Sequence, residues 1–347
     1  MIIPTQAMID FLVGLLETPS PTGYTPEAIS YCAEAFSALN LPNCTFRTTP
    51  KGALMLHWRG TDASAPRGLT AHTDTLGLMV KEIKASGTLK VTNLGGLIWH
   101  SIDSENVTIQ TFDKRRYRGT VLLVNPAKHV NPNVDDTKRS ADTLEVRLDE
   151  RVHSEADVRA LGIEVGDFIF LDPRVELTPS GFIKSRFLDD KACVATLYGA
   201  LMALRDSGQT PRQDLHIQIA TYEEVGHGGA EGFPPNLAEL ISLDMGALGH
   251  GQNGDEFSVS LCVKDSGGAY HWETISALRH LANQYDIPIK TDIYPYYSSD
   301  GTAYWRAGGS ARVGLIGPGV ASSHGYERTH REALDHTAHL IARYALS

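Results

Sequence analysis

The chain has 347 residues and a formal net charge of −10, with its 14 histidines counted as neutral. This length suits one large α/β domain or two domains. The negative charge argues against a nucleic-acid partner, and no apolar run reaches the roughly 18 residues of a membrane span. The N-terminal segment carries no basic leader and no small-residue cleavage signal, so we expect a cytoplasmic protein. The 4 cysteines form no CxxC pair, which argues against a thiolate zinc cluster.

The N-terminal region is predicted to form two helices and then two strands. The helices span residues 6–16 and 26–39, and the strands span 53–58 and 68–71. His72 and Asp74 follow the second strand. In an extended segment their side chains point to the same side, so the carboxylate could orient the imidazole behind a bound metal. The alternative is a strand-end histidine that simply hydrogen-bonds to its neighbour.

The middle of the chain has the pattern of an inserted β-rich domain. Short apolar runs are separated by turn residues, with one short helix at 155–161; these predicted strands are 107–111, 117–124, 144–148 and 167–171. We therefore expect an α/β domain made of residues 1–77 and 172–347, and an inserted β-rich domain of residues 78–171.

A central helix is predicted after Lys191, with Val194, Leu197 and Leu201 on one buried face. Asp189 and Asp190 directly precede it. An aspartate at this position caps a helix more often than it binds a metal. A pair of carboxylates at a turn also suits a divalent cation, so both interpretations stay open.

The α/β pattern then resumes, and acids again follow the strands. The strand at 215–220 leads to Glu223 and Glu224, and the strand at 240–243 stops at Asp244. The remaining elements are predicted as strands at 257–263, 289–293 and 312–316, a helix at 271–285, a loop at 297–301 with Asp300, the segment with His324, and a C-terminal helix. For Asp300, contact with substrate and capping of its loop are equally plausible.

Potential metal ligands share a position at or just after the end of a predicted strand, or at the turn into the central helix: His72, Asp189, Glu224, Asp244 and His324. Imidazoles and carboxylates without thiolates suit zinc, cobalt or manganese in an open catalytic site. Five ligands exceed the needs of one tetrahedral ion with a water. They suffice for two ions if one carboxylate bridges them, so the sequence favours a dinuclear site.

Seven motifs occur in a fixed order along the chain: PSPTG, AHTDTLG, SRFLDDK, EEVG, LDMG, SSDG and SSH. In this order they resemble the dinuclear-metal aminopeptidases that include glutamyl aminopeptidase and the tetrahedral aminopeptidases, family forty-two of the metallopeptidases. The resemblance spans nearly the whole chain. It implies that residues 1–77 and 172–347 form a catalytic domain with a mixed central sheet flanked by helices. It also implies that residues 78–171 form a small PDZ-like β domain that supports dimerisation or oligomerisation, and that the protein is a homo-oligomer built from dimers up to a dodecamer.

The resemblance also implies a role for each site residue. His72 would bind one metal, Asp189 would bridge both, Glu224 and His324 would complete one ion, and Asp244 the other. Glu223 would be the general base, and Asp74 would hold His72 from behind. The peptide bond after the bridging aspartate would be cis, and Asp190 is the alternative bridge. The implied reaction removes the N-terminal residue of a small peptide.

One departure bears on the substrate. His324 is followed by GYERTH, where many family members have Ser-Pro. With SRFLDDK and GQN, this resembles a bacterial subgroup associated with the osmoprotectant N-acetylglutaminylglutamine amide, so deacylation or amide hydrolysis of a modified dipeptide is an alternative. A metal-binding scaffold without catalysis is a third reading, against which Glu223 argues, since a scaffold needs no base. The other histidines considered are expected at the surface or in hydrogen bonds: His227, His250, His271 and His330.

Overall fold

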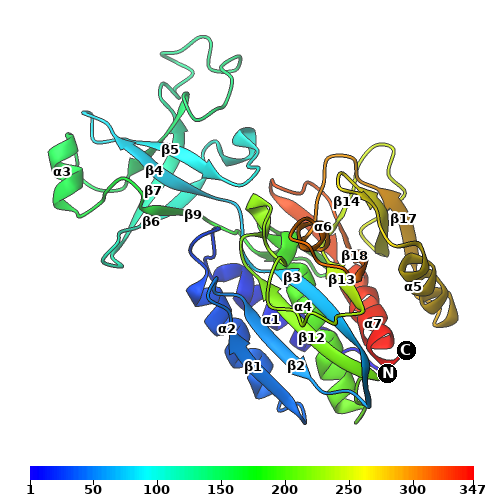
Figure 1. Cartoon of the computed structure of the whole chain (residues 1–347). Coiled ribbons are helices and arrows are strands. Elements are labelled where there is room, and N and C mark those ends of the chain that lie inside the picture. The colour runs from blue at the N-terminus through cyan, green and yellow to red at the C-terminus, as the bar shows by residue number, and fades with distance from the viewer. The chain divides into compact units, whose positions relative to one another are not determined.

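The computed structural model describes residues 1–347 and divides into two compact units (Figure 1). The larger unit comprises Met1–Asp74 and Arg174–Ser347, and the smaller unit is Thr75–Pro173. The insertion therefore begins three residues after His72, and the larger unit is assembled from both ends of the chain. None of the helices combines the length and the apolar character that a membrane crossing needs.

The larger unit is organised around a mixed ten-stranded sheet. Its strands, in spatial order, are β1 (Cys44–Thr48), β2 (Leu54–Trp58), β12 (Gln213–Ala220), β3 (Asp62–His72), β13 (Glu239–Leu243), β18 (Arg312–Val320), β15 (Val259–Asp265) and β16 (Gly268–Ala269), while β14 (Gly246–Ala247) pairs with β18 and β17 (Ile289–Ile293) with β15. The four central strands β12, β3, β13 and β18 run parallel to one another. Their carboxyl ends therefore meet at one edge, where open α/β sheets bind ligands.

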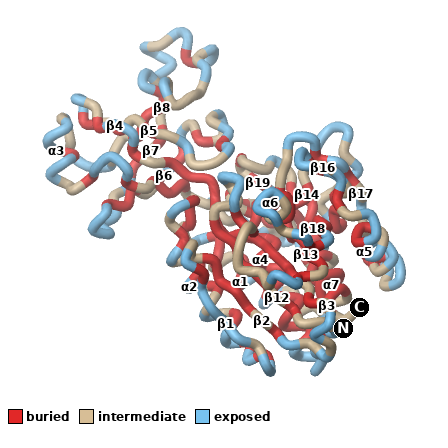
Figure 2. Tube along the Cα trace, in the orientation of Figure 1, coloured by how far each residue is buried: buried red, intermediate tan, exposed pale blue.

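The helix α4 (Leu188–Asp206) lies in the interior of the larger unit. It packs against the sheet and against α1 (Thr5–Glu17) and α7 (Arg331–Leu346). The sequence predicts one buried face, and this prediction is wrong: almost every residue of α4 up to Leu204 is buried (Figure 2). Small residues permit this close packing, since a Cβ on Gly199 would lie 2.6 Å from the sulfur of Met8 in α1.

Two further helices flank the other half of the sheet. Successive residues of a strand face opposite sides. Gly314 of β18 faces α5 (Trp272–Gln284), whereas its neighbour Val313 contacts α6 (Asp300–Arg306). These two helices therefore cover opposite faces. The remaining helix of this unit, α2 (Pro26–Ala38), follows α1 and begins with a proline in its first turn, where the missing N–H costs no hydrogen bond.

Helix α6 occupies part of a segment that the sequence predicts to be a loop. Ser299 caps it, with a reciprocal pair of hydrogen bonds to Thr302. Gly301 lets the helix approach the sheet, because a Cβ there would lie 2.6 Å from Val313 Cγ1. As a result Asp300, the first residue of α6, is only 2% exposed and lies against the sheet.

The smaller unit is a closed barrel of six strands: β4 (Gly77–Ile83), β5 (Leu89–Leu94), β8 (Leu144–Leu148), β7 (Arg116–Leu123), β6 (Asn106–Gln110) and β9 (Phe168–Leu171). Its interior is apolar, as Val107 and Ile109 illustrate on alternate positions of β6. A short 3₁₀ helix, η1 (Trp99–Ile102), and α3 (Glu155–Ala160) lie in its connections. The expected inserted β-rich domain is confirmed, but β4 and β5, which close the barrel, were not predicted.

Candidate metal centre

The predicted ligands come together at the carboxyl ends of the central strands. His72 is the last residue of β3, and Asp244 directly follows β13. Glu223 and Glu224 begin the 3₁₀ helix η2 (Glu223–Val225) after β12, and His324 lies in the connection between β18 and β19 (Glu327–His330). Asp189 enters from the start of α4. The parallel pairing of β12, β3, β13 and β18 is the reason that residues so far apart in sequence share one site.

The imidazole of His72 presents one free nitrogen to the site. Its Nδ1 lies 2.9 Å from the carbonyl oxygen of Asp74 and 3.6 Å from Asp74 Oδ1. A proton on Nδ1 donated to that carbonyl leaves the lone pair of Nε2 available. His72 is 1% exposed, and its Nε2 has no hydrogen-bond partner. A buried imidazole nitrogen with a free lone pair and a fixed ring orientation is well suited to bind a metal.

The carboxylate of Asp189 lies between the two predicted histidine ligands. Its Oδ1 is 3.4 Å from Nε2 of His72, and its Oδ2 is 3.6 Å from Nε2 of His324. His324 Nε2 is also 3.6 Å from Oε2 of Glu224. The peptide bond between Asp189 and Asp190 is cis, as the family resemblance predicts. Each oxygen of Asp189 therefore faces a different imidazole, which is the arrangement that a bridging carboxylate requires.

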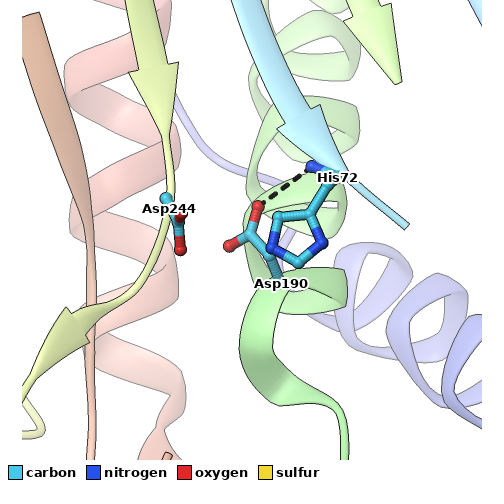
Figure 3. A group of neighbouring side chains, drawn as sticks. All are labelled: His72, Asp190 and Asp244. Atoms are coloured by element: carbon cyan, nitrogen blue, oxygen red, sulfur yellow. Dashed lines mark hydrogen bonds between the residues drawn. The ribbon is translucent and has the colours of Figure 1, made fainter. Parts of the chain in front are cut away.

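Asp190 and Asp244 form a second group with His72 (Figure 3). One potential ligand atom from each of these three buried residues lies within 4.8 Å of the others. Asp190 Oδ2 accepts a hydrogen bond from the backbone N–H of His72 at 3.2 Å, whereas its Oδ1 and Oδ1 of Asp244 have no partner. Buried polar atoms without partners are costly, and a cation would satisfy them. The donor set, imidazole and carboxylate without thiolate, fits a divalent metal.

The electrostatics of the site also fit bound cations. Burial, reinforced by neighbouring carboxylates, raises the pKa of Asp190, Glu224 and Asp244 well above the usual range. Burial acts on Asp189 in the same direction, but its contacts with His72 and the charge of His324 prevail and lower its pKa. When buried carboxyl groups lie this close together, it costs free energy for all of them to ionise. Divalent cations bound between them would offset that cost.

Asp74 holds three parts of the site. Its Oδ1 accepts the backbone N–H of Glu223 at 3.1 Å, and its Oδ2 accepts that of Glu224 at 3.3 Å. The hydroxyl of Thr22 donates to the same Oδ2 at 2.8 Å, and the backbone carbonyl of Asp74 contacts His72. Asp74 therefore positions both the histidine and the two glutamates, and the early loop with Thr22 supports it.

The sequence reasoning missed Glu327. This residue is 2% exposed; its Oε2 accepts the backbone N–H of Asp189 at 3.0 Å, and its Oε1 accepts that of His324 at 3.0 Å. It comes this close because β19 pairs with β11 (Phe182–Ser185), which leads into α4, and Glu327 lies opposite Ser185. The available signal was an acid three residues after His324, inside the segment that departs from the usual family pattern.

Asp300 lies behind the glutamates. Its Oδ2 accepts the hydroxyl of Thr70 at 2.8 Å, whereas its Oδ1 has no hydrogen-bond partner. A Cβ on Gly228 would lie 2.2 Å from that Oδ1 and 3.0 Å from the backbone nitrogen of Glu223. The loop after η2 thus packs between Asp300 and Glu223 because it has glycine there. Contact of Asp300 with substrate stays a prediction.

Substitution of Gly228 by alanine tests this packing. The added methyl group must displace either Asp300 or the backbone of Glu223, so we expect kcat to fall by about tenfold or more, since small misplacements of reacting groups are costly. Gly249→Ala is the matched control, because a Cβ there meets nothing within 4 Å. Steady-state kinetics of the two variants make the comparison, and equal activities would contradict the packing argument.

The family model of M42 glutamyl aminopeptidase matches residues 52–340. The chain belongs to this family. It is 44% identical over 339 residues to the putative aminopeptidase YhfE of Bacillus subtilis, covering 98% of this chain and 97% of the relative. It is 27% identical over 250 residues to the lysyl aminopeptidase of Pyrococcus furiosus, covering 70% and 69%. The resemblance inferred from the motifs is confirmed.

Solved structures of related enzymes share the fold. The TET aminopeptidase of a marine sediment Thaumarchaeota archaeon matches with a TM-score of 0.87 at 16% identity, covering 98% of this chain and 96% of that one. The PhTET1 dodecamer matches with a TM-score of 0.84 at 18% identity, covering 98% and 99%. The predicted α/β class is confirmed. As a member of this aminopeptidase family, the protein is a metal-dependent exopeptidase, and neither a deacylase nor a non-catalytic scaffold is favoured.

Proposed function

We propose that the site holds two divalent metal ions, zinc foremost, with cobalt or manganese as alternatives. The ligands would be His72, Asp189, Glu224, Asp244 and His324, with Asp189 as the bridge. Support for that bridge comes from its two oxygens, which face different histidines at 3.4 and 3.6 Å. Asp190, whose Oδ2 accepts the N–H of His72, then serves to hold that histidine in place.

Glu223 is proposed as the general base. Its Oε2 lies 3.7 Å from Nε2 of His72, and Asp74 holds its backbone nitrogen. When bound, two cations would polarise the scissile carbonyl and lower the pKa of a water between them. The carboxylate of Glu223 would accept a proton from that water and later deliver it to the departing amine. The observation that carries the proposal is the position of the Glu223 carboxylate beside the proposed ligand His72.

The proposed substrate is a small peptide, from which the N-terminal residue is removed. Chelator-treated protein is expected to lose turnover of aminoacyl amides and short peptides, and to regain it when zinc, cobalt or manganese is added, because the ligand set requires cations to function. Turnover that persists without metal would contradict the proposal. Cleavage of N-acetylated dipeptides in preference to free ones would instead support the deacylase alternative.

We also propose a homo-oligomer built from dimers, up to a dodecamer. Among the solved structures of similar fold, PhTET1 is a dodecamer, and the TET1 peptidase of Pyrococcus horikoshii can assemble into a tetrahedron or a large octahedral shell. Multi-angle light scattering of the purified protein measures the subunit number directly. A monomer at micromolar concentration would contradict the proposal.

A further inference from the structure

A lysine and two stacked rings form a cluster beside the segment of the proposed base: Lys51, Tyr222 and His227. Lys51 Nζ donates to the carbonyl oxygen of His227 at 2.5 Å and lies 3.2 Å from its Nδ1. The ammonium also lies 5.5 Å from the centre of the Tyr222 ring, which stacks on the His227 ring at 5.2 Å. The sequence predicts that His227 lies at the surface or forms hydrogen bonds. The structure shows that its partners are Lys51 and Tyr222.

The chain connects this cluster to Glu223 on both sides. Tyr222 directly precedes Glu223, and the backbone N–H of His227 donates to the carbonyl of Tyr222 at 3.1 Å, which closes the loop around the glutamate. The next residue, Gly228, packs against the backbone of Glu223. The carbonyl of Lys51 accepts the hydroxyl of Thr221 at 3.2 Å, so the lysine is tied to the end of β12.

The ammonium group of Lys51 has no carboxylate partner, although the nearby site is rich in acids. Its ammonium contacts a carbonyl oxygen and an imidazole, and not a carboxylate. The groups on the metal side of Glu223 are mostly acids, namely Asp189, Asp190, Glu224 and Asp244. Burial raises the pKa of Asp300 to about 6, and the charge of Lys51 acts weakly against this rise, so the ammonium lies in the neighbourhood of Asp300. Lys51 therefore supplies a positive charge next to the loop that carries the base, whereas the other charged groups of the site are mostly acids.

We propose that Lys51, supported by His227 and Tyr222, forms a subsite for a carboxylate of the substrate, foremost the C-terminal carboxylate of a dipeptide. The inference rests on the proposed aminopeptidase function and narrows its substrate class. A dipeptide is a zwitterion with an ammonium at one end and a carboxylate at the other, and the site carries the complementary charges. An ammonium that lacks an acidic partner is available for a charge-assisted hydrogen bond.

The test compares alanyl-alanine with alanyl-alanine amide, which differ in the terminal carboxylate. With zinc-loaded wild-type protein, kcat/KM is expected to be about tenfold higher for the free acid. This factor corresponds to the free energy that one charge-assisted hydrogen bond contributes. In Lys51→Met this ratio should fall to about one. Lys290→Met is the control: it removes one charge that is 45% exposed in the same unit, and it should retain the wild-type ratio.

A second pair of substrates, alanyl-glutamate amide and alanyl-glutamine amide, distinguishes the two sources of the carboxylate. A Lys51-dependent preference for the glutamate over the glutamine compound would place a side-chain carboxylate in the subsite. Ratios that Lys51→Met leaves unchanged for all pairs would overturn the inference. Calorimetric binding of alanyl-alanine and its amide to zinc-loaded Glu223→Gln, with and without Lys51→Met, gives the same comparison without turnover, so failure of the proposed activity stays separate from failure of the subsite.

Discussion

Replacement of Glu223 by glutamine is expected to lower kcat by about 10²- to 10⁴-fold, the usual contribution of a general base, while the protein retains its metals. The amide has nearly the same shape but cannot accept the proton. The backbone of residue 223 stays held by Asp74, so the neighbouring Glu224 should keep its position. Steady-state kinetics and metal analysis by mass spectrometry measure the two effects on the same sample.

The matched control is Glu34→Gln on α2, which makes the same change at an exposed glutamate. It should leave both kcat and metal content unchanged. A Glu223→Gln variant with preserved rate would remove the proposed mechanism. A variant that loses its metals would mean that Glu223 is a ligand and that the base is another group.

Replacement of Glu327 by alanine is expected to lower zinc affinity by about 10- to 100-fold, the usual effect of losing a group that orients metal ligands. Glu327 accepts the backbone N–H groups of both Asp189 and His324, so it joins the start of α4 to the loop before β19. Without it, two backbone N–H donors lose their acceptor, and the two ligands can move apart. Competition with a zinc chelator measures the affinity.

Glu332→Ala is the control for Glu327, because it removes a glutamate only five residues away whose side chain is 58% exposed. Its zinc affinity should match that of the wild type. Glu327→Gln, which keeps one acceptor oxygen, should lie between the wild type and Glu327→Ala, and it provides the measurement if the alanine variant does not fold. Zinc affinity that is the same in all these proteins would show that Glu327 does not position the ligands.

Local patterns in the sequence predicted much of the fold. The helices α1, α2 and α5 and the strands β2, β12 and β13 follow from apolar periodicity and from the prolines and glycines that end them. Strands β4, β5 and β19 were missed, because short strands with mixed polarity are recognisable only by the neighbours they pair with. Burial of α4 on all sides was missed for the same reason, since it depends on what packs around the helix.

The sequence by itself determined which residues could bind metal and where each lies along the chain, because ligand type and strand ends are local properties. Only the tertiary structure decided which distant groups touch. Glu327 contacts Asp189 across 138 positions of sequence, and Lys51 contacts His227 across 176. Such contacts depend on strand order and on close packing at glycines such as Gly228. Local sequence patterns predict neither of these.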